Sequence, residues 1–192
     1  MRAYFPIRTA VGAARRQQGF SLLELMVTVI VLGLIAAIAV PSFAELRRRT
    51  ALSTSANEIV AAVQTARMEA IRLNAPVEVA CAGAGCAQNR WERLQVRQGA
   101  TVIREHAFPT GVTVRGSTNV AGNNNRLRFG ADGFASMGAS RAGAIGACST
   151  EMRDATNGVD VMVNVSRVST NRRAATSACN APPNTLTSDG QQ

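Results

Sequence analysis

One uninterrupted apolar segment limits the folds open to this chain of 192 residues. The segment runs from Phe20 to Val40, FSLLELMVTVIVLGLIAAIAV, and contains a single charged residue, Glu24. At about 1.5 Å per helical residue its 21 residues extend about 31 Å, the thickness of the hydrocarbon core of a bilayer. The 19 residues before it contain four Arg and no acid. A basic leader before one apolar segment is typical of an export or anchoring signal.

Three kinds of signal fit this arrangement. An ordinary secretory signal peptide would be cut after Ala39, within the A-x-A pattern Ala37-Ile38-Ala39, and would release a secreted protein such as an enzyme. Against this, such signals usually have an apolar region of about 7–15 residues, which is shorter than the segment found here. A plain N-terminal anchor would keep the whole segment. A prepilin-type leader would be cut at the inner end, so that the segment stays in the mature protein.

The residues at the start of the segment favour the prepilin-type leader. Gly19-Phe20-Ser21-Leu22-Leu23-Glu24 resembles the prepilin signature of type IV pilins and type II secretion pseudopilins. The resemblance implies that a prepilin peptidase cuts between Gly19 and Phe20 and that Phe20 is N-methylated. It also implies a helix-bending role for Pro41, and assembly with other major and minor pilins or pseudopilins. Independently of the resemblance, Gly19 has no side chain, so a protease can approach its backbone closely.

Glu24 is a candidate assembly residue, because a carboxylate inside a membrane costs about 2.5–3.5 kcal/mol on insertion scales. Its natural partner would be a cation at similar depth. Cleavage would create one at the new amine of Phe20, so Glu24 of a neighbouring subunit could pair with it and set the stagger between helices. The alternative is that Glu24 extends to the cytoplasmic face, which is four residues away.

The remaining sequence predicts an α+β fold, in which a long helix packs on antiparallel sheets. Residues 42–73 contain neither Gly nor Pro, and apolar residues recur there with a period close to 3.6: Leu52, Ala56, Ile59, Val60, Val63, Ala66, Ala70 and Ile71. From Val77 the period is two, which predicts strands at Val77–Cys81, Trp91–Arg97, Thr101–Phe108, Val112–Arg115, Arg126–Phe129 and Val159–Val168. We expect a kink at Pro41, and a loop in the glycine-rich residues 136–147.

These features predict five regions along the chain. They are a cleaved leader (1–19), a transmembrane and assembly half of the helix (20–40), an amphipathic half (41–73), a β-rich domain (74–179) and a flexible tail (180–192). This organisation resembles the H-type pseudopilins and the related minor pilins FimU and FimT. Arg128-Phe129-Gly130-Ala131-Asp132-Gly133 resembles a strand-turn of that family. The resemblance implies a non-enzymatic filament subunit, with priming of the filament tip as a finer hypothesis.

The four cysteines indicate the compartment. An even number beyond a membrane anchor suggests disulfides formed in an oxidising periplasm. We pair Cys81 with Cys86 and Cys148 with Cys179, although other pairings remain open. The predicted location is therefore the bacterial inner membrane, crossed once, with the C-terminal domain in the periplasm and later incorporation into a pilus or pseudopilus. The run Arg47–Arg49 is expected to meet lipid headgroups of the inner membrane or neighbouring subunits.

The sequence offers little for catalysis. His106 is the only histidine, and it occupies an alternating position in a predicted strand. Glu92 and Glu105 could form a carboxylate pair, but nothing in the sequence brings them together. The spacing of Cys81 and Cys86 is loose for a zinc site. We therefore expect no catalytic residue, no metal and no cofactor.

The basic charge raises a second hypothesis. All 21 basic residues are Arg, against 12 acidic residues, and the net charge is +9. Near the C-terminus lie Arg167, Arg172 and Arg173, and Arg suits bidentate contact with phosphate. Some FimT-like minor pilins bind DNA in natural transformation through a G-R-x-R motif. The nearest match here is Asn171-Arg172-Arg173-Ala174, in which Asn replaces Gly. The alternative function is thus a DNA-binding minor pilin.

Overall fold

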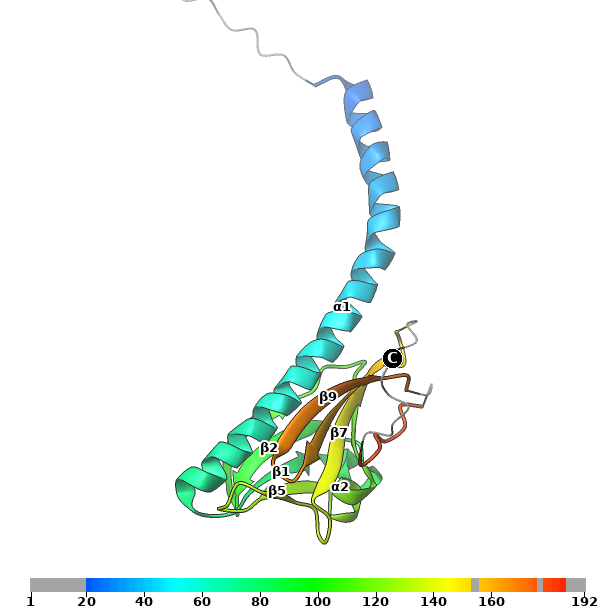
Figure 1. Cartoon of the computed structure of the whole chain (residues 1–192). Helices are drawn as coiled ribbons and strands as arrows, with labels where there is room; N and C mark the ends of the chain where they lie inside the picture. The colour runs from blue at the N-terminus through cyan, green and yellow to red at the C-terminus, as the bar shows by residue number, and fades with distance from the viewer. Residues whose placement is uncertain (1–19, 153–155, 176–177, 186–192) are drawn as a thin grey trace, which may run out of the picture. The chain divides into compact units, whose positions relative to one another are not determined.

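The computed structural model describes residues 20–152, 156–175 and 178–185. The chain divides into two compact units, Met1–Pro41 and Ser42–Gln192. The elements in chain order are α1 (Leu22–Leu73), β1 (Val77–Ala82), η1 (Ala84–Gln88), β2 (Arg93–Gln98), β3 (Thr101–Ala107), β4 (Thr113–Gly116), α2 (Thr118–Gly122), β5 (Arg126–Phe129), β6 (Ala135–Ser136), β7 (Ala142–Cys148), β8 (Gly158–Asn164) and β9 (Arg167–Arg173) (Figure 1). The long helix and the antiparallel sheets confirm the predicted fold class.

In the first unit the described residues are almost entirely helix. Ser21 caps the helix, because its Oγ accepts a hydrogen bond from the backbone amide of Glu24 at 3.1 Å. Every described side chain from Phe20 to Val40 is exposed. No described residue of this unit covers its apolar surface. Among the described residues, α1 is the one helix long and apolar enough to cross a membrane.

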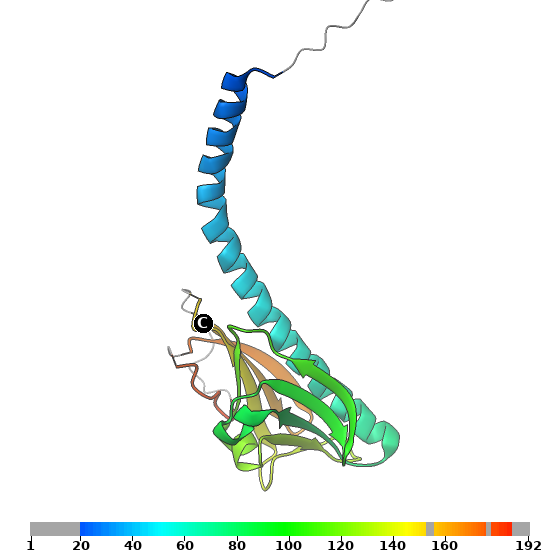
Figure 2. The same cartoon turned by 180° about the vertical axis from the view of Figure 1, so that it is seen from behind.

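In the second unit the remainder of α1 lies against two antiparallel sheets (Figures 1 and 2). The five-stranded sheet has the order β3-β2-β1-β5-β6, and the four-stranded sheet has the order β4-β7-β8-β9. Strands β1 to β5 each begin and end within two residues of the predicted strands.

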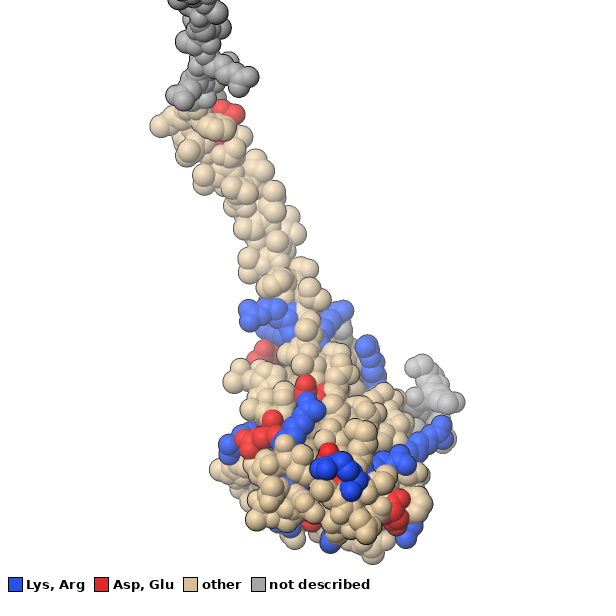
Figure 3. Space-filling model, turned by 90° about the vertical axis from the view of Figure 1, so that its left-hand side faces the viewer, with Lys and Arg blue, Asp and Glu red and all other residues tan. Residues whose placement is uncertain are grey.

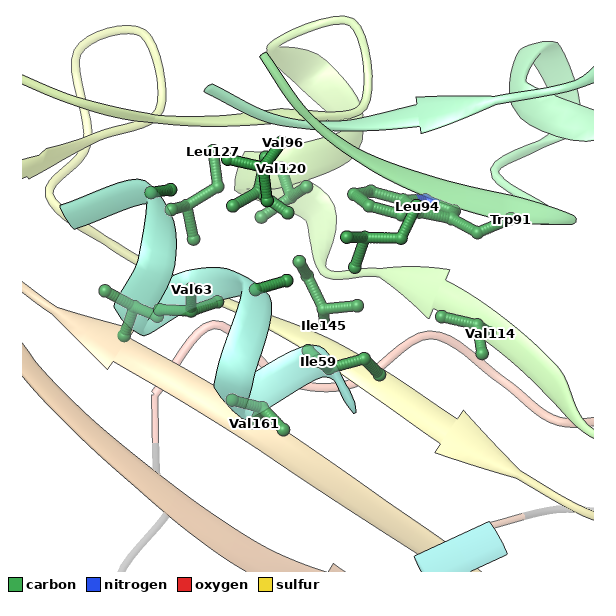
Figure 4. Packing of buried hydrophobic residues seen from close by; sticks show 14 of the residues in the cluster. Ile59, Val63, Trp91, Leu94, Val96, Val114, Val120, Leu127, Ile145 and Val161 are labelled. Carbon is green, nitrogen blue, oxygen red and sulfur yellow. The ribbon is translucent and has the colours of Figure 1, made fainter. Parts of the chain in front are cut away.

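The core of the second unit lies where the buried face of α1 meets both sheets (Figure 4). Ile59 and Val63 of α1 contribute to it with Leu94 and Leu127 of the five-stranded sheet and Val161 of the four-stranded sheet. Burial of each such side chain contributes about 1.5–3 kcal/mol. Most of the predicted apolar stripe of α1 is buried, which confirms the helix face that the sequence predicts to pack on the core.

Two positions of α1 differ from the predicted stripe. Ile71 is 52% exposed, because the stripe has rotated to the edge of the domain by the last turn. Ser55 is fully buried, and its hydroxyl donates to the carbonyl of Ala51 at 2.8 Å, which satisfies the polar group within the helix. A hydroxyl that bonds its own helix can therefore occupy a core position that polarity alone assigns to the surface.

The single strand predicted at Val159–Val168 is wrong. The chain forms β8 and β9, which pair as a hairpin from Gly158↔Arg173 to Asn164↔Arg167. The turn places Val165 at a φ of 57°, a conformation that a β-branched residue rarely adopts. Tertiary hydrogen bonds hold it there: its amide donates to Arg141 at 2.8 Å and its carbonyl accepts from Ala135 at 2.7 Å. Neither partner is recognisable from the local sequence.

The predicted loop at residues 136–147 is also wrong, because it contains most of β7. This strand lies between β4 and β8, and six of its seven residues are buried. Its small residues reflect crowding rather than flexibility. A side chain at Gly143 would collide with Met137, and one at Gly146 would collide with Asp160. Strand prediction from apolar alternation misses such a strand, because Ala and Gly carry little of that signal.

Part of the predicted flexible tail packs on the domain. Pro182 is buried against Gly146 of β7, and the Asn184 side-chain oxygen accepts a hydrogen bond from the amide of Asn119 at 2.9 Å. Residues 180–185 thus cover the four-stranded sheet on the side opposite α1. Residues 186–192 lie outside the described residues.

Candidate functional site: the assembly helix and the arginines that follow it

The first candidate site is the start of α1. Gly19 and the leader lie outside the described residues, so the structure begins at Phe20, on the far side of the predicted cut. Ser21 and Glu24 have the S-x-x-E spacing of a capping box, which predicts a helix start at this point. The carboxylate of Glu24 is exposed and has no ion pair among the described residues. A carboxylate in the first turn also interacts favourably with the helix dipole.

The exposed apolar surface of α1 is the largest feature of the site. Large side chains along its first half are more than half exposed, for example Leu22 (80%), Leu32 (65%) and Ile38 (77%). Exposed apolar surfaces of this kind mark sites of contact with a membrane or with other proteins. Pro41 lies within α1, which is helical on both sides of it.

Three consecutive arginines follow the apolar half of α1, and Figure 3 shows basic side chains gathered on this part of the helix. Arg48 Nε lies 3.2 Å from Glu151 Oε2, and Arg49 Nε lies 3.3 Å from Glu45 Oε1. Arg47 is exposed and, with Arg48, lines a cavity of about 240 Å³. Since successive helix residues are about 100° apart, the three guanidinium groups point to different sides of α1.

The three C-terminal arginines do not form one cluster. Arg167 and Arg172 lie at opposite ends of β9, about 17 Å apart at about 3.3 Å per residue. Arg172 points toward α1, whereas Arg173 points to the other face of the sheet. Arg173 is also engaged there, because its Nη1 donates to the side-chain oxygen of Asn180 at 2.8 Å and its Nε lies 2.7 Å from Asp160 Oδ2.

Asp160 is the most deeply buried acid among the described residues. Its residue exposure is 0%, and both of its carboxylate oxygens accept hydrogen bonds from Arg173. Burial raises the pKa of the Asp160 carboxyl, and the contacts with Arg173 only partly counter this effect. Sequence analysis missed this pair, because the cross-strand register that joins β8 to β9 carries no local signal.

The structure contains two disulfides, Cys81–Cys86 and Cys148–Cys179, each with a Cα–Cα distance of 5.8 Å. The first closes η1 onto the end of β1. The second joins the end of β7 to the C-terminal segment that covers the four-stranded sheet. Both cross-links therefore hold loop or terminal segments on the domain.

The residues considered for catalysis have separate structural partners. Glu92 Oε1 accepts a hydrogen bond from the amide of Gly85 at 3.2 Å, and Glu105 Oε1 lies 3.2 Å from Arg93 Nη1. His106 Nδ1 lies 3.7 Å from Glu58 Oε2, which Arg104 also contacts at 2.6 Å. The described residues contain no group of three or more His, Cys, Asp or Glu that could hold a metal ion.

Comparisons with known proteins give one family match for the N-terminal apolar segment and one for the β-rich domain. Residues 55–169 match the family described as Type II transport protein GspH, and residues 14–40 match the prokaryotic N-terminal methylation motif. Two fimbrial proteins of Pseudomonas aeruginosa are each 40% identical over 57 residues, which cover 30% of this chain and 36% of each relative. The chain thus spans about a third of the length of the curated relatives it matches.

Two crystal structures of the Pseudomonas aeruginosa type IV minor pilin FimU resemble the fold. They have a TM-score of 0.50, with sequence identities of 20% and 21%. The matches cover 68% and 70% of this chain, and 97% and 94% of the respective FimU chains. At this identity the likeness shows a shared fold.

Proposed function

Because the chain belongs to the GspH family of type II transport proteins, we propose that its mature form is a non-enzymatic minor subunit of a filament. The filament is a type IV pilus or the pseudopilus of a type II secretion system. Maturation removes residues 1–19 by cleavage between Gly19 and Phe20, and Phe20 becomes N-methylated. Before assembly the subunit is anchored in the inner membrane with its β-rich domain in the periplasm, and it then enters the filament.

The observation that supports this proposal most directly is the difference in side-chain exposure between the two halves of α1. From Leu52 onward α1 buries its apolar stripe in its own domain, whereas from Phe20 to Val40 it leaves every described side chain exposed. The methylation motif covers this exposed half. A helix that supplies both a core and an uncovered apolar surface suits storage in lipid followed by packing against the helices of other subunits.

Glu24 has a specific task in this proposal. In the filament its carboxylate pairs with the N-methylated amine of Phe20 in a neighbouring subunit. Such a pair would compensate two charges that are both costly in an apolar bundle. Since Ser21 caps the helix through the amide of Glu24, the first turn is ordered and holds the carboxylate at a defined height.

The finer assignments rest on different observations. The family description favours a type II secretion system, while the fold of FimU favours a type IV pilus. Neighbouring genes distinguish them: minor pilins with a large tip adhesin indicate a pilus, and a secretion apparatus indicates a pseudopilus. For either filament we propose a place at the tip, where a minor subunit primes assembly.

DNA binding through Arg167, Arg172 and Arg173 stays a prediction that the arrangement of these residues does not favour. A duplex needs several phosphate contacts on one surface, and these three side chains lie apart or are already engaged. The variant Arg167→Gln/Arg172→Gln tests it, since it spares the contact of Arg173 with Asp160. Loss of DNA binding with intact filament assembly would support the alternative function.

The main test is to express the full chain in a strain that assembles the filament. Mass spectrometry of the mature chain should find an N-methylated Phe20 as the first residue. The variant Glu24→Gln should be processed and remain in the membrane, but be absent from purified filaments. Glu69→Gln, which alters a partly exposed carboxylate that pairs with Arg72 on the same helix, is the matched control and should assemble normally. A mature chain that begins at Val40, or normal assembly of Glu24→Gln, would contradict the proposal.

A further inference from the structure

A second cavity, of about 540 Å³, lies between α1 and the β8–β9 hairpin, entirely within the second unit. Arg49, Ser53 and Asn57 line it from α1, and Thr170 and Arg172 line it from β9. Its volume falls in the range of small-molecule sites, about 300–1,000 Å³. The strand pairing explains why Arg172 lies here: it is opposite Val159, another lining residue, on the face of the hairpin that packs toward α1.

The lining of this cavity is suited to an anion. The guanidinium group of Arg172, hydroxyl groups and side-chain amides supply hydrogen-bond donors, and no described lining residue carries a carboxylate. Arg49 also contacts Glu45, with Nε 3.3 Å from Oε1. Arg172 has neither an ion pair nor a hydrogen bond from its side chain to any described residue, so its donors face the cavity and solvent. Arg is the side chain best shaped to bind phosphate.

The cavity also has an apolar side and a particular place in the sequence. Leu52 and Ala56 line it and are almost completely buried. Arg49 follows Val40, the end of the apolar segment, by nine residues on the same helix. The cavity thus places hydrogen-bond donors for an anion beside an apolar wall, on the helix that leaves the bilayer. This combination matches the phosphate and glycerol regions of a lipid headgroup.

We propose that this cavity binds the phosphate of an anionic phospholipid while the subunit is stored in the membrane. The inference rests on the proposed function, because only a subunit held in the membrane meets such a headgroup. The concave site receives one flexible headgroup, whereas a rigid duplex would need Arg167 and Arg173 beside Arg172, and both lie on the other face of the hairpin. The lipid contacts are broken when the subunit enters the filament, so the site belongs to the stored state.

Native mass spectrometry of the full mature chain, released from neutral detergent with equal amounts of phosphatidylglycerol and phosphatidylcholine, tests this inference. We expect one phosphatidylglycerol to be retained in excess. Arg172→Gln should reduce this retention about tenfold or more, the effect of losing a charge-assisted contact with phosphate. Arg128→Gln, on β5 of the other sheet, is the matched control and should retain the lipid. Equal melting temperatures of the two variants establish that both are folded.

Two competitors separate the sources of phosphate. Displacement of the lipid by millimolar inorganic phosphate would overturn the lipid assignment in favour of free phosphate. Displacement by a short DNA duplex would overturn it in favour of nucleic acid. Equal retention of both lipids, or normal retention by Arg172→Gln, would also overturn it. The proposed function is tested separately, by the mass of the mature chain in the same spectrum and by filament incorporation. Failure of the lipid site can therefore be distinguished from failure of the proposed function.

Discussion

Arg173 Nε lies 2.7 Å from Oδ2 of Asp160, whose side chain is completely buried, while 14% of the Arg173 side chain is exposed. This contact joins the last strand to its neighbour beneath the C-terminal segment. The nearby carbonyl of Asn180 also accepts from Arg173 Nη2 at 3.1 Å. One guanidinium group therefore holds a strand, a buried charge and the C-terminal segment together.

Loss of this contact should be costly. Arg173→Gln would leave the carboxylate of Asp160 buried without its cation, and removal of one partner of a buried pair typically costs about 3–5 kcal/mol. Urea unfolding of the full chain in neutral detergent, followed by the fluorescence of Trp91, measures the free energy of unfolding. The chain has this one tryptophan, and it is 2% exposed. Arg167→Gln, at the exposed start of the same strand, should change stability by less than about 0.5 kcal/mol. Similar values for both variants would contradict the structural role of Arg173.

The pH dependence of stability should report on Asp160. Because burial raises its pKa above the value in the unfolded chain, about 3.9, the folded state binds this proton more strongly. The stability that this bound proton contributes is therefore complete below about pH 4, and it is lost as the pH rises through the pKa of Asp160 in the folded state. Asp160→Asn cannot titrate at this position. The unfolding free energy of the wild type minus that of the variant should therefore increase as the pH falls from about 7 to about 4. A difference that shrinks on acidification would show that Arg173 outweighs burial.

The two disulfides should differ in their effect on stability. Cys148–Cys179 joins residues 31 apart, and Cys81–Cys86 joins residues five apart. In the chain-entropy model the longer loop contributes about 3–4 kcal/mol and the shorter about 2 kcal/mol. Unfolding of Cys148→Ser/Cys179→Ser and of Cys81→Ser/Cys86→Ser in guanidinium chloride measures both values. A larger loss for the shorter loop would mean that native packing of η1, rather than loop entropy, dominates.

Two isoleucines on α1 test the buried face of the helix. Ile59 is fully buried, whereas Ile71 is 52% exposed. Ile59→Ala should cost about 2–5 kcal/mol through lost burial and the cavity left behind. Ile71→Ala should cost less than about 1 kcal/mol, and urea unfolding compares the two directly. Equal losses would contradict the exposure of Ile71 at the last turn.

Several elements follow from local patterns, and others do not. The period of 3.6 in α1 and the alternation in β1, β2, β4 and β5 predict these elements, because each buries one face against the core. β3 is an edge strand without a buried residue, and its apolar residues Val102 and Ile103 are exposed. The candidate sites divide in the same way: the start of α1 is visible in the sequence, whereas the cavity beside Arg172 requires the pairing of β9 with β8. The Ser21–Glu24 spacing could have predicted the helix cap, but no local pattern joins Asp160 to Arg173.

The sequence alone determined that a long, partly uncovered apolar helix precedes an antiparallel β-rich domain, since apolar length and periodicity are local properties of the chain. Only the tertiary structure decided that the Gly- and Ala-rich segment is the buried strand β7, that Val165 turns the chain between β8 and β9, and that Arg172 and Arg173 face opposite sides of a sheet. Each of these depends on groups distant in sequence: the crowding around Gly143, the hydrogen bonds to Val165 and the pairing of two strands.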